Sequence, residues 1–219
     1  MIKINDNIIL KATELFTKYT GADIVYTDCV NCINKVEDLS KIGDKEVIKI
    51  IDFLVEWKCR GLVGSSSPNI QKMSRQLEDM KKTLRSLNNE FKKLKGYTLK
   101  DVPLENEDIK KTILTIYKDI DSVKQIGPTA ASKIMHIINP RLFIMWDEAI
   151  RTDKRGYGYE RGTADQYIEF MKKMQSIAIT LKTNWEEKEI EIPIRKRRTL
   201  TKLIDEVNYM GITRNIKIE

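Results

Sequence analysis

A potentially reactive carboxylate, Asp147, follows the apolar run FIMW and directly precedes a short helical segment, EAIR. The same stretch of chain begins upstream with Gly127-Pro128 and is interrupted by Asn139-Pro140. No other part of the sequence places turn-forming residues so close to a potentially reactive group. Aspartate is also a good helix N-cap, so the residue type alone permits either a chemical or a structural role.

The remaining inventory of reactive residues excludes several kinds of site. His136 is the only histidine and lies among isoleucines with no nucleophile signature, so we expect it to be packed rather than part of a catalytic triad. Cys29, Cys32 and Cys59 are too few thiols for a four-cysteine metal or cluster site, and their odd number argues against a disulfide framework. Neither GxxxxGK[ST] nor a GxGxxG after a strand occurs. We therefore expect no metal and no cofactor.

A helical hairpin is predicted around the sequence DSVKQIGPTAASKI. One helix ends near Ser122, a tight turn follows at residues 125–127, and Pro128 occupies the first position of a second helix. Such a turn directs free backbone N–H groups and a helix N-terminus outward, which suits a phosphate oxygen and needs no particular base. An ordinary helical hairpin without a ligand is the alternative.

The hairpin and the residues after it resemble a known family over about residues 121–151. In order, the chain carries the hairpin 123–127, the helix start 128–132, and the apolar run 143–146 ending in Asp147. This arrangement resembles the helix-hairpin-helix DNA glycosylase superfamily, which includes endonuclease III, the adenine glycosylase and the 8-oxoguanine glycosylases. The 18-residue step from Thr129 to Asp147 is similar to the step from the lysine position to the catalytic aspartate in endonuclease III-like members.

The resemblance implies roles for individual residues. Asp147 would be the catalytic carboxylate, and Gln125, Ile126, Gly127 and Thr129 would form the DNA-binding hairpin. Gln125 departs from the family pattern because it replaces the first glycine of the hairpin.

Thr129 is the more serious departure, since it stands where bifunctional members carry a Schiff-base lysine. A hydroxyl cannot form an imine, so the resemblance favours a monofunctional enzyme in which Asp147 stabilises a cationic sugar or orients water. Lys133, one helical turn on, is the alternative amine, with its β-carbon about 5 to 6 Å from that of Thr129.

Two basic segments follow Asp147. In RTDKRGYGYERG, the residues Arg151, Arg155, Tyr157 and Tyr159 could contact phosphates and stack on exposed bases, or the segment could be a solvated loop. In IRKRRTLTK, we expect the cations of 195–198 and Lys202 to face phosphate or solvent, and Thr199 or Thr201 to cap a helix.

Composition bounds the class of protein and its partner. The chain has 219 residues, 39 of them Lys or Arg and 32 Asp or Glu, which gives a net charge of +7. An excess of positive charge favours a polyanionic partner, here duplex DNA, although many lysine-rich proteins carry such a charge with no associated function. The sequence has no apolar run long enough for a membrane helix and no recognisable signal peptide, so we expect no membrane partner and a cytoplasmic location.

Helical periodicity dominates the chain, so the predicted fold class is all-α. The expected helices cover residues 6–19, 23–36, 44–60, 68–95, 106–121, 128–138, 147–154, 163–183 and 197–209. Short strands are possible at 188–194 and 212–218.

The helix over 68–95 carries a heptad seam from Ile70 to Leu94 that predicts packing against one partner helix. We expect that partner to lie within the same chain, which makes the protein a monomer. A dimer formed through residues 70–94 is the alternative.

These observations predict one helical domain over 1–219, with subregions 1–60, 68–95, 106–154 and 163–219. The fold expected is glycosylase-like, with one long heptad-patterned helix. The function expected is DNA binding through the hairpin, with monofunctional base excision as the leading activity. A non-catalytic DNA-binding or scaffold protein of the same fold is the alternative, and nothing in the sequence favours an RNA-binding module.

Overall fold

The computed structural model describes residues 3–19, 23–152, 154–182 and 198–218, and within these ranges its regular structure is entirely helical. The all-α prediction is therefore confirmed for the part of the chain that is described. The possible strand at 188–194 lies outside the described residues, and residues 212–218 contain no strand. None of the described helices combines the length and the apolar character needed to cross a bilayer.

Contacts along the chain divide it into two compact units, each described here by itself. Unit 1 consists of Met1–Gly21, Tyr97–Val102 and Pro140–Glu219, and unit 2 consists of Ala22–Gly96 and Pro103–Asn139. Residues 1–60 therefore contribute to both units. The hairpin belongs to unit 2, whereas Asp147 and the segments after it belong to unit 1.

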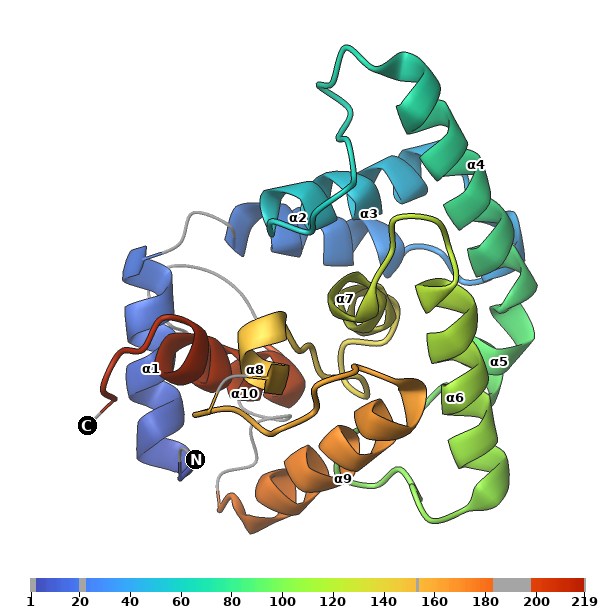
Figure 1. The fold of residues 1–219 in the computed structure, drawn as a ribbon. Coiled ribbons are helices and arrows are strands. Elements are labelled where there is room, and N and C mark those ends of the chain that lie inside the picture. Colours follow the sequence, from blue (N-terminus) through green and yellow to red (C-terminus); the bar gives the residue numbers. More distant parts are fainter. Residues whose placement is uncertain (1–2, 20–22, 153, 183–197, 219) are drawn as a thin grey trace. The chain divides into compact units, whose positions relative to one another are not determined.

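Unit 2 is built from helices α2 to α7 (Figure 1). Their bounds are α2 Asp23–Ile33, the 3-10 turn η1 Leu39–Lys41, α3 Asp44–Glu56, α4 Ile70–Ser86, α5 Asn88–Lys93, α6 Glu107–Asp121 and α7 Pro128–Ile138. Helices α2, α3 and α6 all pack against α7, and residues 130–137 of α7 are buried. The second helix of the hairpin is thus a core element rather than a surface helix.

Side-chain caps explain where several of these helices begin. The Asn69 side chain accepts a hydrogen bond from the N–H of Lys72 at the start of α4, and Asn106 accepts from Asp108 and Ile109 at the start of α6. Pro128, which has no N–H to satisfy, occupies the first turn of α7. Local sequence chemistry therefore fixes the start of each helix of the hairpin.

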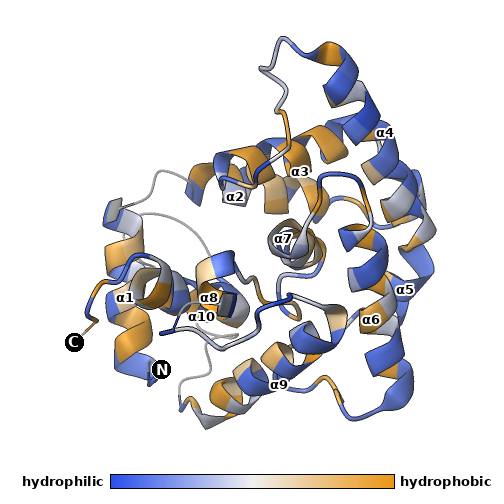
Figure 2. Cartoon of the chain, in the orientation of Figure 1, coloured by the Kyte–Doolittle hydropathy of each residue, from blue (hydrophilic) through white to orange (hydrophobic). Residues whose placement is uncertain are grey.

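The uninterrupted helix predicted over 68–95 is wrong, because Leu87 separates α4 from α5. The seam positions from Leu77 onward are buried, whereas Ile70 is 71% exposed. Helix α4 packs against α3, η1 and α6 of the same unit, so several elements meet it instead of one partner helix. Much of the visible surface of α4 is hydrophilic (Figure 2).

Unit 1 contains α1 Asp6–Tyr19, α8 Glu148–Thr152, α9 Ala164–Thr180, α10 Leu200–Asn208 and the π-helical turn η2 Tyr209–Thr213. Helix α1 packs against α10, and α8 packs against η2. The apolar run 142–146 is completely buried, and Trp146 packs edge-on to Tyr167 at a ring-centroid distance of 5.1 Å. This run therefore belongs to the core of unit 1 and ends at the half-buried Asp147.

Candidate nucleic-acid interface

A tight turn joins α6 to α7, as predicted for a helical hairpin. The N–H of Ile126 donates to the carbonyl oxygen of Val123 at 2.9 Å, and Gln125 adopts a left-handed backbone conformation with φ 73°. Gly127 is the N-cap of α7 and has an extended backbone. Buried side chains of Val123 and Ile126 anchor the turn to unit 2.

The outer face of this turn offers backbone donors. The N–H groups of Gly127, Thr129 and Ala130 donate to no other described residue. A β-carbon placed on Gly127 would meet no atom beyond its chain neighbours within 4 Å, so the space beside this residue is open. Unpaired N–H groups at a helix N-terminus favour an anion, because their partial positive charges point in one direction.

The side chain of Gln125 does not face this open space. Its Oε1 accepts a 2.6 Å hydrogen bond from Nε2 of Gln76 on α4. Of the four predicted hairpin residues, Gly127 and Thr129 remain partly exposed at the turn, whereas Ile126 is buried. The groups that the turn leaves without a partner are therefore main-chain groups more than side chains.

Lys133 lies inside unit 2 and is only 6% exposed. Its amine donates to the carbonyl oxygen of Trp57 at 3.1 Å, lies 3.7 Å from Sγ of Cys59, and stands 5.3 Å from the centre of the Trp57 ring. These contacts engage the amine in the interior of the unit, and the alternative of a catalytic Lys133 stays a prediction. No local pattern predicts this pairing, since Trp57 and Lys133 are 76 residues apart.

His136, on the same helix, is packed as expected. It is fully buried, and its Nε2 forms a 2.8 Å hydrogen bond with the Tyr26 hydroxyl. Tyr26, Trp57 and Phe53 form a group of aromatic rings beside it.

Asp147 caps α8 and is held through both of its carboxylate oxygens. Oδ1 accepts from the N–H of Ile150 at 2.7 Å, and Oδ2 accepts from the Thr213 hydroxyl at 2.7 Å. The predicted N-cap role is therefore present, and a second contact comes from 66 residues further along the chain. Thr213 lies in the π-helical turn η2, a type of distortion that is frequent at functional sites.

The described part of the first predicted basic segment, residues 151–162, packs against the rest of unit 1. The Arg151 guanidinium is buried and donates to the carbonyl oxygens of Tyr159 and Glu160, both at 3.1 Å. The Tyr157 hydroxyl donates to Oδ1 of Asn208 at 2.8 Å, and burial raises the pKa of this phenol above its usual range. Arg151 and Tyr157 are thus interior residues, which corrects their predicted role as DNA contacts.

The other two residues of that loop are more accessible. The Arg155 side chain is exposed. Tyr159 is half-buried, with its ring centroid 6.1 Å from that of Trp146, and burial together with Glu169 raises the pKa of its hydroxyl. Of the four predicted contacts in this segment, Arg155 and part of Tyr159 are at the surface.

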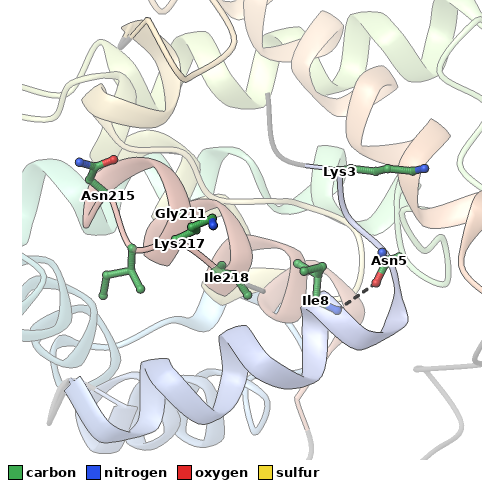
Figure 3. A pocket seen from close by; sticks show the side chains of 8 residues that line it. Lys3, Asn5, Ile8, Gly211, Asn215, Lys217 and Ile218 are labelled. Atoms are coloured by element: carbon green, nitrogen blue, oxygen red, sulfur yellow. Dashed lines mark hydrogen bonds between the residues drawn. The ribbon is translucent and has the colours of Figure 1, made fainter.

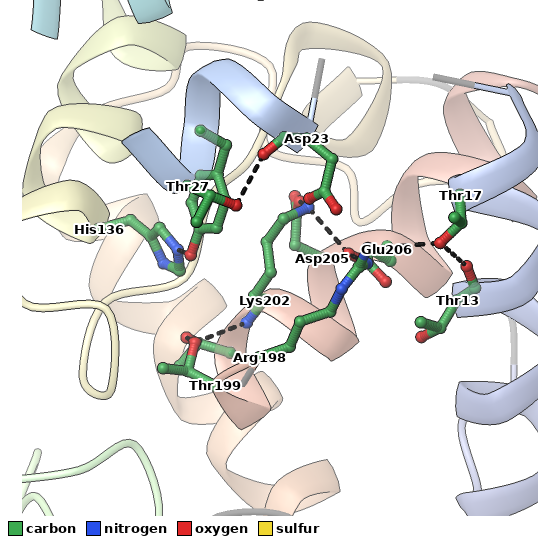
Figure 4. Close-up of polar contacts among 12 residues, drawn as sticks. Thr13, Thr17, Asp23, Thr27, His136, Arg198, Thr199, Lys202, Asp205 and Glu206 are labelled. Carbon is green, nitrogen blue, oxygen red and sulfur yellow. Dashed lines mark hydrogen bonds and ion pairs between the residues drawn. The ribbon is translucent and has the colours of Figure 1, made fainter. Parts of the chain in front are cut away.

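The second basic segment also differs from expectation. Residues 195–197 lie outside the described residues, but Arg198 and Lys202 are buried beside acidic partners in α10 (Figure 4). Arg198 forms an ion pair with Glu206, and the Lys202 amine lies 3.2 Å from Oε1 of Glu206 and 4.1 Å from the centre of the Phe16 ring. These two cations are consequently unavailable to phosphate or solvent. Thr199 caps α10 by accepting from the N–H of Lys202, as predicted.

Unit 1 also contains a groove of about 640 Å³ that holds none of the predicted site residues (Figure 3). Lys3, Asn5 and Ile8 line one part of it, and Gly211 with residues 215–218 line the rest. Its described lining residues include two lysines and three isoleucines, and none of those described residues is a nucleophile or a carboxylate.

Comparison of the chain with protein-family models, with curated proteins and with solved structures finds no match. The candidate site consequently rests on the sequence and on the geometry of each unit.

Proposed function

We propose that the protein binds the sugar-phosphate backbone of duplex DNA through the hairpin between α6 and α7. The observation that carries the proposal is the start of α7, where the N–H groups of Gly127, Thr129 and Ala130 donate to no other described residue and a β-carbon on Gly127 would meet open space. Three donors at one helix N-terminus can share one phosphate group without reading a base. The net charge of +7 adds a general attraction for a polyanion.

The burial of α7 supports this proposal on mechanical grounds. Residues 130–137 are held in the core of unit 2, so the donors at the start of the helix are attached to a rigid element. A preorganised donor set loses little conformational freedom when an anion binds, which favours affinity.

Fluorescence-anisotropy titration of a labelled duplex at several salt concentrations tests the proposal. Phosphate contacts release counterions, so affinity should fall steeply between about 50 and 200 mM salt. Binding that is absent, or that does not depend on salt, contradicts the proposal.

Within this proposal, base excision without strand cleavage is the favoured chemistry, and Asp147 is the residue that would carry it. Two hydrogen bonds from separate elements fix the orientation of its carboxylate. A carboxylate held in this way can stabilise positive charge on a sugar or orient a water molecule. An imine-forming route has less support, because Thr129 has no amine and the Lys133 amine is bound to Trp57.

A non-catalytic DNA-binding protein is the second candidate. The observation that favours it is the N-cap geometry of Asp147, which gives this residue a structural role without any reaction. Release of damaged or mispaired bases from a panel of duplexes separates the two candidates, since only the enzyme leaves abasic sites.

A further inference from the structure

The loop between α3 and α4 lies beside the hairpin, and two separate contacts hold residues 57–63 of this loop in place. We call these residues the 57–63 loop. The first contact is at its start, where the Lys133 amine of α7 donates to the Trp57 carbonyl oxygen and approaches Cys59. A side-chain contact therefore joins the hairpin helix to the beginning of the loop.

Gln76 of α4 makes the second contact and joins three segments with one amide. Its Nε2 donates to Oε1 of Gln125 at 2.6 Å and to the Gly61 carbonyl oxygen at 3.3 Å, while its Oε1 accepts from the N–H of Val63 at 3.2 Å. Gln76 is buried, with only 5% of its surface exposed. An amide that is both buried and fully hydrogen-bonded fixes the relative positions of its partners, because losing any one bond leaves a buried polar atom unsatisfied.

Gln125 takes part in this arrangement because of its unusual backbone. At φ 73° its side chain is directed toward the 57–63 loop, and a β-carbon added to Gly61 would lie 3.4 Å from Cβ of Gln125. A glycine at position 125 would adopt this backbone more readily but would have no side chain for Gln76 to hold. The residue that departs from the family pattern thus connects the hairpin turn to the neighbouring loop.

Exposed cations lie on the segments that Gln76 and Lys133 hold together. Lys58 and Arg60 belong to the 57–63 loop, and Lys124 precedes Gln125 in the hairpin. None of these three forms an ion pair with another described residue. Four acidic side chains are near them in sequence. Glu56 and Asp119 are exposed, Asp121 is half-buried, and the half-buried Asp52 is already hydrogen-bonded to the N–H and hydroxyl of Ser65.

We infer that the 57–63 loop and the hairpin turn form one composite phosphate-binding edge, in which Lys58, Arg60 and Lys124 contact the DNA backbone beside the phosphate held by the turn. Gln76 is a positioning residue in this edge. The inference rests on the proposed DNA binding and extends it from a single phosphate to adjacent ones. Because the contacts are with backbone phosphates, the edge sets the register of the duplex but does not read its sequence.

Charge-neutral variants test the edge by anisotropy titration of the full chain with a labelled duplex. Arg60→Gln and Lys124→Gln should each reduce the slope of log affinity against log salt by roughly 0.9. Lys45→Gln is the matched control, since it removes the same charge from an exposed residue in the first turn of α3, at the opposite end of that helix from the loop. It should leave the slope unchanged.

The role of Gln76 is tested through Gln125→Gly, which removes its partner while favouring the left-handed turn. In this background, Arg60→Gln should reduce the salt slope by less than it does in the wild-type chain, because the 57–63 loop is no longer held against the turn. Circular dichroism should show an unchanged helix content for Gln125→Gly. An equal effect of Arg60→Gln in both backgrounds would overturn the positioning role.

Failure of this inference is distinguishable from failure of the proposed function. If the wild-type chain binds DNA and Gly127→Asp weakens that binding, but Arg60→Gln and Lys124→Gln behave like Lys45→Gln, the composite edge is wrong and hairpin binding stands. If the wild-type chain binds no duplex at low salt, both are wrong.

Discussion

The Thr213 hydroxyl donates a 2.7 Å hydrogen bond to Oδ2 of Asp147, while the other carboxylate oxygen accepts from the first turn of α8. The contact joins the end of an apolar core segment to a π-helical turn 66 residues later. A carboxylate fixed at both oxygens cannot rotate freely, so its lone pairs keep a constant direction. This constraint matters whether Asp147 only caps a helix or also acts on a substrate.

Removing the hydroxyl should have a measurable effect on stability. We expect Thr213→Val to lower the free energy of unfolding by about 1.5 to 3 kcal/mol, because one hydrogen bond to a carboxylate is lost. Urea denaturation followed by circular dichroism measures the change. Thr180→Val is the control, since the exposed Thr180 hydroxyl bonds only to the carbonyl oxygen of Ile177. An equal loss of unfolding free energy in both variants would show that the contact with Asp147 adds no stability beyond that of an exposed hydroxyl.

Base release, if it occurs, should depend on the charge of Asp147. Asp147→Asn should abolish release while leaving DNA affinity nearly unchanged, because asparagine still caps a helix but cannot stabilise a cationic sugar. Gel assays of abasic-site formation and anisotropy titration measure the two properties. Full activity in the Asn variant would exclude Asp147 as the catalytic carboxylate.

Reduction with borohydride should trap no covalent protein–DNA adduct. No amine stands at Thr129, and the Lys133 amine is bound to the Trp57 carbonyl oxygen. Denaturing gel electrophoresis after incubation with lesion-containing duplex measures trapping. Efficient trapping that disappears in Lys133→Ala would instead identify Lys133 as a nucleophile.

A carboxylate placed at the hairpin turn should weaken DNA binding. In Gly127→Asp the new side chain enters space that is empty within 4 Å, so repulsion of a phosphate, rather than a clash, causes the loss. We expect at least a tenfold reduction in affinity at low salt, or about 1.4 kcal/mol. Ser176→Asp adds the same charge on the exposed face of α9 and should change affinity far less.

Alkaline pH should destabilise the protein through groups that are buried in their neutral form. Burial raises the pKa of Cys29 from 9.0 to about 12, and it raises the pKa of Tyr157 above the ordinary 10.0. Above these ordinary values the unfolded chain loses protons that the folded chain retains, so stability is full below about pH 9 and falls as pH rises. The maximum slope is about 1.4 kcal/mol per pH unit for each group.

Urea unfolding of Tyr157→Phe between pH 7 and pH 11 tests how much the Tyr157 phenol contributes to the loss of stability at alkaline pH. The variant should be less stable at pH 7, because Asn208 loses its hydrogen-bond partner, yet its stability should decline less steeply above pH 10 than that of the wild-type chain. Parallel declines in the two proteins would show that Tyr157 does not contribute.

The sequence predicted helix positions well where local chemistry determines them. Asn106, Thr163 and Pro128 mark the starts of α6, α9 and α7, and each acts within its own first turn. The break at Leu87 was missed because the apolar spacing continues through it, so periodicity alone shows no interruption.

The candidate site was harder to predict, because long-range partners decide where a polar side chain points. The sequence predicts an exposed Arg151, but its guanidinium is buried because it donates to carbonyl oxygens of the following loop. Gln76 carries no sequence signal at all, since its role depends on Gly61, Val63 and Gln125 being brought together by the fold. Such contacts follow from tertiary packing and have no local signature.

The interleaving of the two units along the chain has a consequence for biosynthesis. Every residue of unit 2 has been made once position 139 is added, whereas unit 1 draws on segments from both sides of that stretch. Helix α1 packs against α10, and Thr17 accepts a hydrogen bond from Arg198, 181 residues later. Since a ribosome extends the chain from its N-terminus, α1 emerges early and must wait for α10 before it can bury its apolar face. During that interval α1 presents an apolar surface, while the helices of the hairpin already have their partners.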